Sequence, residues 1–309
     1  MPLVSMSKLL ADAKRGGYAV CYCEAWNLES FQAVVEAAEE ESSPIIAGFN
    51  GGFLMHPGRK RAENLTFYAA LGSSLTKARV PAALLFNESA SLAQIERAIG
   101  LGFNAVMVEN EGFELDDYRR LVRQVVAKAH RSGVSVEAQV GHLAHASANG
   151  HADPTTPEAA RTFVEDTGID ALGVAVGNVH ILTKGNAPLD LAALAEIGRA
   201  VSVPLVLHGG TGIPLEDAAR CVRLGVAKVN FGTGLKQAYL AALREKLARY
   251  HEPMSPHPFI GMGGDDDILV AGREAVKLKC RELLRAYGSA GKAETAFPNL
   301  MEGREVHDH

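Results

Sequence analysis

The chain has 309 residues, of which 47% are hydrophobic and 6% aromatic, and its 31 Lys and Arg against 36 Asp and Glu give a formal net charge of −5. This length allows two average domains or one large α/β barrel, with a core that needs no disulfide or metal for its stability. The acidic balance and the scattered basic residues exclude a nucleic-acid-binding surface. No apolar run approaches the ~18 residues that a membrane-spanning helix needs.

The N-terminus and the cysteines indicate the compartment. The N-terminus lacks the basic region and the long apolar region of a signal peptide. The four cysteines, at positions 21, 23, 221 and 280, have the spacing of neither a disulfide framework nor a zinc ribbon. We therefore expect a cytoplasmic globular protein with no membrane or nucleic-acid partner.

Short apolar segments alternate with longer amphipathic ones along almost the whole chain. The short segments are rich in Val, Ile, Leu and Ala without polar alternation, which is typical of parallel strands covered on both faces. The predicted strands are Tyr18–Cys23, Pro44–Phe49, Pro81–Phe86, Ala105–Val108, Ser135–Val140, Ala171–Val176, Pro204–Leu207 and Ala227–Phe231.

The amphipathic segments predict one helix after each strand. Thr156 followed by Pro157 marks a helix start, and Gly100, Gly133 and Gly225 mark helix ends. The predicted helices are Leu28–Glu41, Asn64–Ala78, Ser91–Gly100, Leu115–Arg131, Pro157–Thr167, Leu189–Ala200, Leu215–Leu224 and Leu235–Tyr250.

Eight strand–helix pairs predict a (β/α)8 TIM barrel, which we favour over a doubly wound sheet because that fold usually has fewer units. An extra helix, Ser7–Arg15, precedes the first strand, and a last helix, Ile268–Tyr287, follows the barrel. We predict a single domain over residues 1–287. The polar segment 288–309 is predicted to be a mobile tail.

In a TIM barrel the functional residues lie at the carboxyl ends of the strands. Polar residues gather at these positions after the third to the eighth predicted strands. They are Asn87, Glu88 and Ser89; Glu109, Asn110 and Glu111; Glu137, Gln139, Gly141, His142 and His145; residues 177–180 and Lys184; residues 208–212; and residues 230–233.

Two histidines at neighbouring strand ends, His180 and His208, indicate a metal site when a glutamate stands at another strand end. A single histidine would be better explained by packing. Neutral imidazole and carboxylate are ligands that suit zinc, manganese, iron or cobalt. The sequence therefore predicts one divalent metal ion per chain.

The glycine-rich turn 209–212 and the turn 230–233 follow the last two predicted strands, where barrels commonly bind phosphate through backbone N–H groups. The alternative is that they are ordinary strand–helix turns, and that Lys184 is an ordinary exposed lysine. We predict a phosphate or substrate site whose members are Gly177, Lys184, Gly209, Gly210, Thr211, Asn230, Gly232 and Thr233.

With these motifs the chain resembles the class II, metal-dependent ketose-bisphosphate aldolases, from about residue 5 to 287. The resemblance is strongest in "TGIDALGVAVGNVH", "VPLVLHGGTGIP" and "GVAKVNFGTGLK". It implies that His180 and His208 are two of three metal-binding histidines. It further implies that Gly209, Thr211 and Thr233 hold the phosphate of dihydroxyacetone phosphate and that Lys184 lies near this phosphate. By the same resemblance, Asn230 contacts the hydroxyl and the carbonyl of the ketose.

The chain departs from the family pattern at the end of the third strand, which reads "PAALLFNES". Asn87 stands in the place of the catalytic aspartate and Glu88 in that of the third metal-binding histidine. Asparagine cannot transfer a proton, whereas glutamate can still bind a metal. Glu109 replaces a family aspartate and Gln139 a glutamate, and Ile181 stands where the family usually has glycine.

The acid–base group is consequently open. Candidates are the carboxyls of Glu109, Glu111 and Glu137, or a histidine of the loop "GHLAHASANGHADP", which holds His142, His145 and His151. The segment "HPFIGMGGDDD" lacks the arginine expected for a second phosphate. Residues 59–61, Arg-Lys-Arg, are a possible substitute or a solvated basic patch.

We therefore predict a metal-dependent, class II aldolase-type lyase that cleaves a C–C bond of a phosphorylated ketose, or a related keto sugar or acid, through an enediolate. The predicted catalytic residues are Asn87, Glu109, Glu137 and Asn230, and the predicted metal ligands are Glu88, His180 and His208. The resemblance implies zinc and a homodimer or homotetramer. The alternatives are a non-catalytic sugar-phosphate-binding relative and a metal-dependent isomerase or epimerase; a metal-binding residue at position 88 favours an enzyme.

Overall fold

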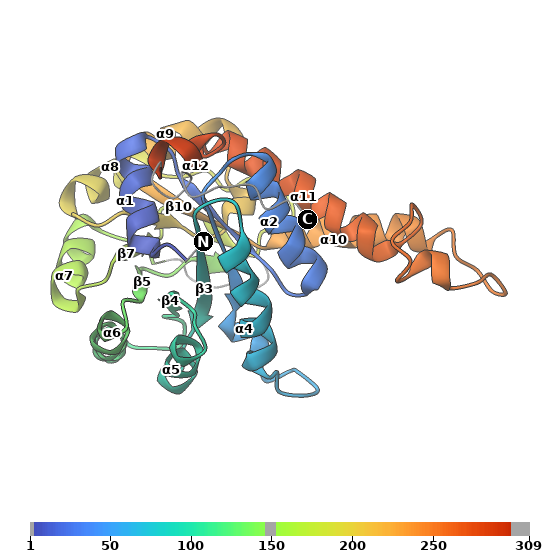
Figure 1. Cartoon of the computed structure of the whole chain (residues 1–309). Coiled ribbons are helices and arrows are strands. Elements are labelled where there is room, and N and C mark those ends of the chain that lie inside the picture. Colours follow the sequence, from blue (N-terminus) through green and yellow to red (C-terminus); the bar gives the residue numbers. More distant parts are fainter. Residues whose placement is uncertain (1–2, 146–152, 298–309) are drawn as a thin grey trace.

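A computed structural model describes residues 3–145 and 153–297, and within them eight parallel strands close into a barrel with the order β1-β10-β9-β7-β5-β4-β3-β2 (Figure 1). This confirms the predicted TIM barrel. The strands of the barrel are β1 (Val20–Glu24), β2 (Ile45–Asn50), β3 (Ala82–Ser89), β4 (Ala105–Val108), β5 (Ser135–Val140), β7 (Ala171–Val174), β9 (Leu205–Leu207) and β10 (Val226–Phe231).

Three strands extend further at their carboxyl ends than the apolar pattern predicts. β1 continues to Glu24, β2 to Asn50 and β3 to Ser89. The ladder continues because parallel pairing does not depend on apolar side chains: Glu24 lies opposite Gly48 in the register of β1 and β2, and Asn50 lies opposite Asn87 in that of β2 and β3. These extensions carry polar side chains into the mouth of the barrel.

The helices lie around the barrel, and most predicted helices are present with ends that differ by at most a few residues from the prediction. The predicted second helix divides into α4 and a 3-10 turn at Ser74–Lys77, and the predicted helix at Leu215–Leu224 begins as a 3-10 turn at Leu215–Asp217. The helices are α1 (Met6–Gly16), α2 (Leu28–Glu40), α3 (Gly51–Leu54), α4 (Leu65–Ser73), α5 (Leu92–Gly100), α6 (Leu115–Arg131), α7 (Pro157–Thr167), α8 (Leu191–Ala200), α9 (Ala218–Arg223), α10 (Thr233–Leu247), α11 (Ile268–Ala286) and α12 (Lys292–Ala296).

Helix α1 closes the amino end of the barrel. Its buried side chains Met6, Leu9 and Leu10 form one apolar cluster with inward-facing strand residues such as Leu85 and Met107. A second, larger cluster fills the layer between the strands and the outer helices. Because the amino end is filled in this way, a cavity can form only at the carboxyl end of the barrel.

A small two-stranded sheet lies outside the barrel and was not predicted. β6 (Ala144–His145) pairs in parallel with β8 (Val179–His180), which places the loop after β5 beside the loop after β7. These two strands are too short to leave a periodic signal in the sequence.

The mobile tail was predicted to begin at residue 288, but several residues after that position are buried. Ser289 and Ala293 are fully buried, and Phe297 is buried as well. The Ser43 hydroxyl donates to the Ser289 hydroxyl at 2.9 Å, and the Lys8 ammonium lies 5.5 Å from the centre of the Phe297 ring. A few small or apolar side chains are enough to hold this polar segment against the body. The remaining part of the predicted tail, residues 298–309, lies outside the described residues.

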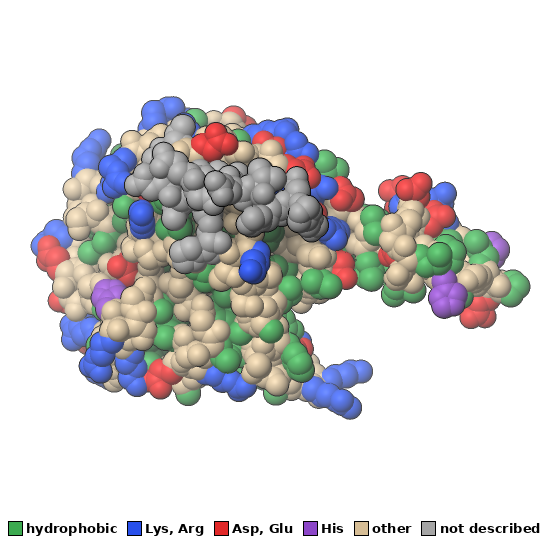
Figure 2. Space-filling model, in the orientation of Figure 1, with side chains coloured by type: hydrophobic (Ala, Val, Ile, Leu, Met, Phe, Trp, Pro, Cys, Tyr) green, Lys and Arg blue, Asp and Glu red, His purple; other side chains and the backbone are tan. Residues whose placement is uncertain are grey.

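Helices α10 and α11 extend away from the barrel as an arm, with residues 248–267 at its end (Figure 1). Of the twelve large hydrophobic side chains that are exposed among the described residues, six lie on this arm: Leu240, Leu247, Met254, Ile260, Met262 and Leu278. Figure 2 shows apolar side chains along the arm and acidic and histidine side chains near its end. Within the described part of the chain, no helix is long and apolar enough to span a membrane.

Candidate active site

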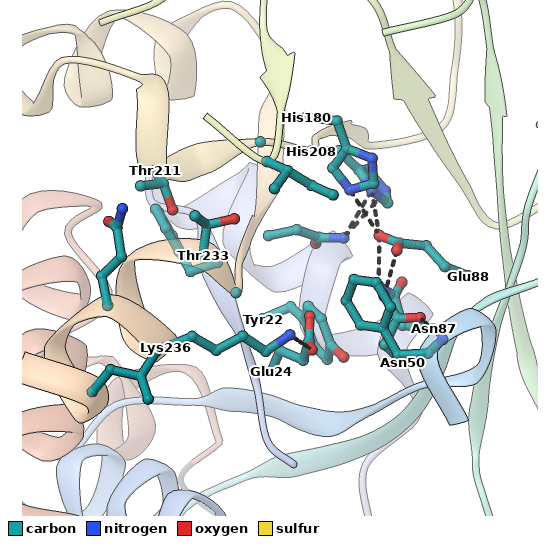
Figure 3. Close-up of a pocket in the computed structure, with 18 residues that line it drawn as sticks. Tyr22, Glu24, Asn50, Asn87, Glu88, His180, His208, Thr211, Thr233 and Lys236 are labelled. Atoms are coloured by element: carbon teal, nitrogen blue, oxygen red, sulfur yellow. Dashed lines mark hydrogen bonds and ion pairs between the residues drawn. The ribbon is translucent and has the colours of Figure 1, made fainter. Parts of the chain in front are cut away.

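A cavity of about 180 Å³ opens at the carboxyl ends of the strands, where the barrel was expected to hold its site (Figure 3). Its walls come from β1, β2, β3, β8, β10, the turn after β9 and the start of α10. The residues that line it are Tyr22, Glu24, Asn50, Phe53, Asn87, Glu88, His180, Ile181, His208, Gly209, Thr211, Asn230, Phe231, Gly232, Thr233, Lys236, Gln237 and Leu240.

The three predicted metal ligands meet on one side of this cavity. Glu88 Oε1 lies 3.3 Å from Nδ1 of His208 and 3.6 Å from Nε2 of His180 (Figure 3). The other carboxylate oxygen, Oε2, accepts a hydrogen bond from the side-chain amide of Asn50 at 2.5 Å. Side chains from β3, β8 and the end of β9 thus converge on one point, as the sequence predicted.

The charges of this group support one another. Burial raises the pKa of Glu88, but hydrogen bonds from His180 and His208 outweigh it and hold the pKa well below the usual range of a carboxyl. Burial lowers the pKa of His208, but its hydrogen bonds to Glu137 and Glu88 outweigh burial and raise the pKa to about 9. The group is therefore a negatively charged carboxylate between two imidazole rings, and its charge favours the protonated form of both rings.

Glu137 was predicted to be catalytic, and in the structure it lies below the cavity and contacts His208. It is fully buried beneath the cavity and is not one of the residues that line it. Its Oε1 lies 2.8 Å from His208 Nε2, and its Oε2 lies 2.7 Å from the ammonium of Lys228, which is also fully buried. Because inward-facing residues in the middle of a strand lie below the barrel mouth, Glu137 contacts His208 from below.

Asn230 occupies the floor of the cavity and is oriented from below. The Lys228 ammonium donates to its Oδ1 at 2.6 Å, so that its Nδ2 faces the ring of His208 at 3.1 Å from Nε2. Lys228 and Asn230 are two residues apart on β10 and therefore point to the same side of the strand.

Asn87 also lines the cavity and is almost completely buried. Its Nδ2 donates to Glu88 Oε1 at 2.9 Å, whereas its Oδ1 has no hydrogen-bond partner among the described residues. A buried amide oxygen without a partner is costly, and such a group in a native fold calls for an explanation. A hydroxyl that enters the cavity would supply the missing donor.

Two cavity residues have backbone conformations that L-residues rarely adopt. Glu88 has φ of 52° and Ile181 has φ of 56°, both in the left-handed region. Ile181 stands where the resembled family usually has glycine, and it holds this conformation with a β-branched side chain. Strained residues of this kind cost about 1–3 kcal/mol each and gather at functional sites.

The opposite side of the cavity is formed by the turns that were predicted to bind phosphate. Thr211, Thr233, Gly209 and Gly232 line it, and the Thr211 hydroxyl accepts a hydrogen bond from the backbone N–H of Gly234 at 3.0 Å (Figure 3). Gly209 has φ of 68°, and a Cβ there would lie 2.2 Å from the carbonyl oxygen of Val179, so only glycine fits. Helix α10 begins at Thr233, and because its N-cap residue Gly232 has no side chain, Thr211 supplies an acceptor to its first turn.

Other residues of the predicted set lie outside the cavity lining. Lys184 is exposed, and Gly177 packs under the carbonyl of Pro188. Gly210 packs against Phe231 and the backbone of Asn230, one residue away from the lining. The carboxylate of Glu109 accepts the backbone N–H groups of Asn110 and Glu111, at 2.7 and 3.1 Å.

The carboxyl of Glu109 keeps a raised pKa, because burial and then the negative charge of Glu88 both disfavour its ionised form. Of the loop histidines, His142 is exposed and its backbone pairs with Asp153. His151 lies outside the described residues, and of His145 only the backbone is described, in β6.

The sequence reasoning missed five polar side chains of the cavity: Tyr22, Glu24, Asn50, Lys236 and Gln237. Glu24 and Asn50 are the last residues of β1 and β2, so the strand-end rule that located Glu88 would also have located them. Lys236 follows Thr233 by three residues on α10 and therefore shares its helical face. Its ammonium forms an ion pair with Glu24 (Figure 3).

Known proteins resemble this chain over almost its whole length. The family described as "Fructose-bisphosphate aldolase class-II" matches residues 4–292. The chain is 36% identical over 302 residues to a fructose-bisphosphate aldolase of Geobacillus stearothermophilus, with 95% of this chain and 99% of that protein covered. It is 36% identical over 298 residues to a probable fructose-bisphosphate aldolase of Bacillus subtilis (strain 168), with 95% and 100% covered.

Solved structures show the same fold over almost the whole chain. The YdjI aldolase from Escherichia coli K12 superposes with a TM-score of 0.79 at 31% identity, covering 94% of this chain and 100% of that one. A putative fructose-1,6-bisphosphate aldolase from Coccidioides immitis superposes with a TM-score of 0.78 at 27% identity, covering 93% and 97%.

Proposed function

This chain belongs to the class-II fructose-bisphosphate aldolase family and is an aldolase-type lyase, and from that premise we propose that it cleaves and forms a C–C bond of a phosphorylated ketose with the help of one divalent metal ion. The observation that carries the proposal is the meeting of Glu88, His180 and His208 in the same cavity as the turns with Thr211 and Thr233.

We propose Glu88, His180 and His208 as the metal ligands. No group of three or more His, Cys, Asp or Glu side chains is arranged for a metal ion among the described residues, so the proposal depends on the donor chemistry and on two separations. Two ligands at about 2.0–2.2 Å from one tetrahedral ion are about 3.4 Å apart, and the Glu88 oxygen lies 3.3 and 3.6 Å from the two imidazole nitrogens.

The surroundings of His208 fit the same role. A metal-binding histidine usually donates its second ring N–H to a carboxylate, and Glu137 accepts from His208 Nε2 while Nδ1 faces Glu88. When bound, the metal would polarise the ketose carbonyl and stabilise negative charge as the C–C bond breaks. Zinc is the family's usual ion; the glutamate ligand keeps manganese, iron and cobalt open.

The phosphate is proposed to bind between Thr211, Thr233 and the backbone N–H groups at the start of α10. Binding there would place the rest of the ketose over Asn230, whose amide is held in orientation by Lys228. The free Oδ1 of Asn87 would accept a hydrogen bond from a substrate hydroxyl. The Asn87 amide cannot act as an acid or base near neutral pH. We therefore propose Glu109 as the acid–base group, because it lies just outside the cavity lining, near enough for the charge of Glu88 to raise its pKa.

The test uses the protein purified without chelator. Metal analysis and a coupled assay for triose phosphate release are carried out with a panel of ketose mono- and bisphosphates. The proposal expects about one metal ion per chain and cleavage of at least one ketose phosphate that stops when the metal is removed. Cleavage that is unaffected by chelation would contradict the metal's role.

We also propose that the protein acts in the cytoplasm as a homodimer or homotetramer. The four cysteines are buried and free, as is usual in a reducing compartment. The exposed apolar side chains of the α10–α11 arm support contact with a second copy of the chain. Light scattering on the purified protein tests the assembly, and replacing Met262 and Ile260 with glutamate should dissociate it if the arm is the contact.

A further inference from the structure

A second hollow, which we call the side chamber, lies next to the reaction cavity. It has a volume of about 460 Å³ and adjoins the carboxyl ends of β1 and β2. Glu24, Asn50, Phe53 and Lys236 line both spaces, so the two are neighbours across these side chains. The other residues that line the side chamber are Ala25, Trp26, Phe49, Leu54, His56, Gly58, Arg59 and Tyr68.

The reaction cavity alone is small for a complete ketose phosphate. Its volume of about 180 Å³ lies below the range of about 300–1,000 Å³ that ligand sites usually have. The side chamber is more than twice as large. A substrate that keeps its phosphate at Thr211 and its carbonyl near His208 can extend further only toward a neighbouring space.

Four aromatic side chains, Trp26, Phe49, Phe53 and Tyr68, line the side chamber. Tyr68 meets Phe49 edge to face at 5.0 Å between ring centres, and Trp26 is held edge to face by Tyr239 at 5.5 Å. Phe53 is 40% exposed and lines both spaces, so part of its ring is accessible to a molecule that enters them. Aromatic rings fixed in this way offer apolar faces to C–H groups while leaving hydroxyl groups free to bind elsewhere.

The cations of the side chamber already have partners. The Lys236 ammonium pairs with Glu24 and lies over the Phe53 ring, 4.4 Å from its centre. Arg59 pairs with Glu63 and also donates to the carbonyl oxygen of Phe53 at 3.1 Å. A phosphate entering here would meet the carboxylate of Glu24 as well as the lysine. Binding a dianion without a free cation is unfavourable, whereas a hydroxyl can donate to Glu24 or accept from Asn50.

We propose that the side chamber binds the end of the substrate that is remote from its phosphate and from the cleaved bond, and that this end is an uncharged polyhydroxylated chain. The substrate class is therefore a ketose monophosphate, with C–H groups of its far end against Trp26 and Phe53 and its hydroxyls toward Glu24 and Asn50. This rests on the proposed function, because the reacting carbons must lie in the reaction cavity.

The experiment runs the reaction in the direction of bond formation, with dihydroxyacetone phosphate as the donor. A carbon of the donor loses one C–H proton and bonds to the aldehyde carbon, and the aldehyde oxygen takes up a proton. The aldehydes are glycolaldehyde, glyceraldehyde, threose and glyceraldehyde 3-phosphate. We expect kcat/KM to be at least about tenfold higher for threose than for glycolaldehyde, and not higher for glyceraldehyde 3-phosphate than for glyceraldehyde. A tenfold preference for the phosphorylated aldehyde would overturn the proposal.

Variants locate the effect in the side chamber. The variants Trp26→Ala and Phe53→Ala should each reduce the ratio of kcat/KM for threose to kcat/KM for glycolaldehyde by about two- to tenfold. This is the range expected for the loss of one aromatic contact. Phe53 is the more exposed of the two side chains. Glu24→Gln releases the lysine charge and should raise the relative use of glyceraldehyde 3-phosphate. Phe67→Ala is the matched control, because Phe67 is 73% exposed and lies outside the chamber; its ratios should equal those of the wild type. Unchanged ratios in both chamber variants would refute the assignment.

A separate measurement distinguishes failure of this proposal from failure of the proposed function. Formation of an enediolate exchanges a C–H hydrogen of dihydroxyacetone phosphate with solvent, and no aldehyde is needed. Exchange in the wild type together with a preference for phosphorylated aldehydes contradicts the side chamber alone. The absence of both exchange and cleavage contradicts the proposed function.

Discussion

Lys228→Met should destabilise the protein and also disorganise the active site. Lys228 and Glu137 are both fully buried, and their charged atoms lie 2.7 Å apart beneath the cavity. Methionine has similar length but no charge, so the substitution leaves Glu137 with His208 as its remaining partner at 2.8 Å. It also removes the ammonium that donates to Oδ1 of Asn230 at 2.6 Å.

The magnitude follows from the burial of the pair. Removing one member of a buried ion pair costs about 3–5 kcal/mol, because the other charge stays buried. We expect about 3 kcal/mol, at the lower end, because His208 remains beside Glu137. An unfolding entropy of about 2.1 cal/mol/K per residue converts this, for 309 residues, into a Tm lower by about 5 °C. The free rotation of the Asn230 amide should in addition lower kcat about tenfold or more, since misplacement of a positioning group is costly.

Thermal unfolding and kinetics of the same samples test this prediction. In the double variant Lys228→Met with Glu137→Gln, the charge left behind is removed, so its Tm should lie between those of the single variant and the wild type. Lys60→Met is the control, because Lys60 is exposed and such changes usually stay within about 0.5 kcal/mol. A single variant that melts within 1 °C of the wild type, or a double variant that melts below the single one, would show that this pair does not support the site.

Three further predictions concern the metal, the phosphate and the substrate. His208→Ala should abolish stoichiometric metal, measured by elemental analysis, whereas the exposed Lys184→Ala should retain it; metal retained in the first variant would contradict the ligand set. A ketose phosphate at 100 times its Kd should stabilise the protein by about 2.7 kcal/mol. The double variant Thr211→Val with Thr233→Val should bind it more weakly, so its Tm should rise less at the same ligand concentration. If a panel of sugar phosphates at millimolar concentration does not shift the melting curve, the turns bind something else. Fructose 1,6-bisphosphate should be cleaved poorly, because the loss of an acid–base group typically lowers the rate about 10²–10⁴-fold. Cleavage is measured by a coupled assay for triose phosphate. A turnover of about 1–10³ s⁻¹, which is typical of enzymes, would refute the importance given to Asn87.

The sequence by itself determined the barrel and the two groups of residues that define its mouth. Eight apolar segments without polar alternation each precede an amphipathic segment, and this periodicity is a local property of the chain. The rule that parallel strands end at the same rim then brings His180, His208 and Glu88 together, and the structure confirms that they meet. The same rule, applied to the first two strands, would have found Glu24 and Asn50.

Only the tertiary structure decided what each of these residues can do. Glu109 and Glu137 look alike as acidic residues near strand ends, but Glu137 lies beneath His208 and pairs with Lys228, because β5 places it deeper in the barrel. Depth along the barrel axis depends on the stagger of neighbouring strands, which no local pattern encodes.

The side chamber and the ion pair of Lys236 with Glu24 likewise depend on contacts between distant segments. Glu24 belongs to the first strand and Lys236 to the helix after the last one, and they meet because the barrel closes by pairing β1 with β10. Closure is a global property of eight strands, and it brings together residues more than two hundred positions apart. The sequence therefore indicates which chemistry this protein can carry, and the closed barrel decides which side chains face the substrate.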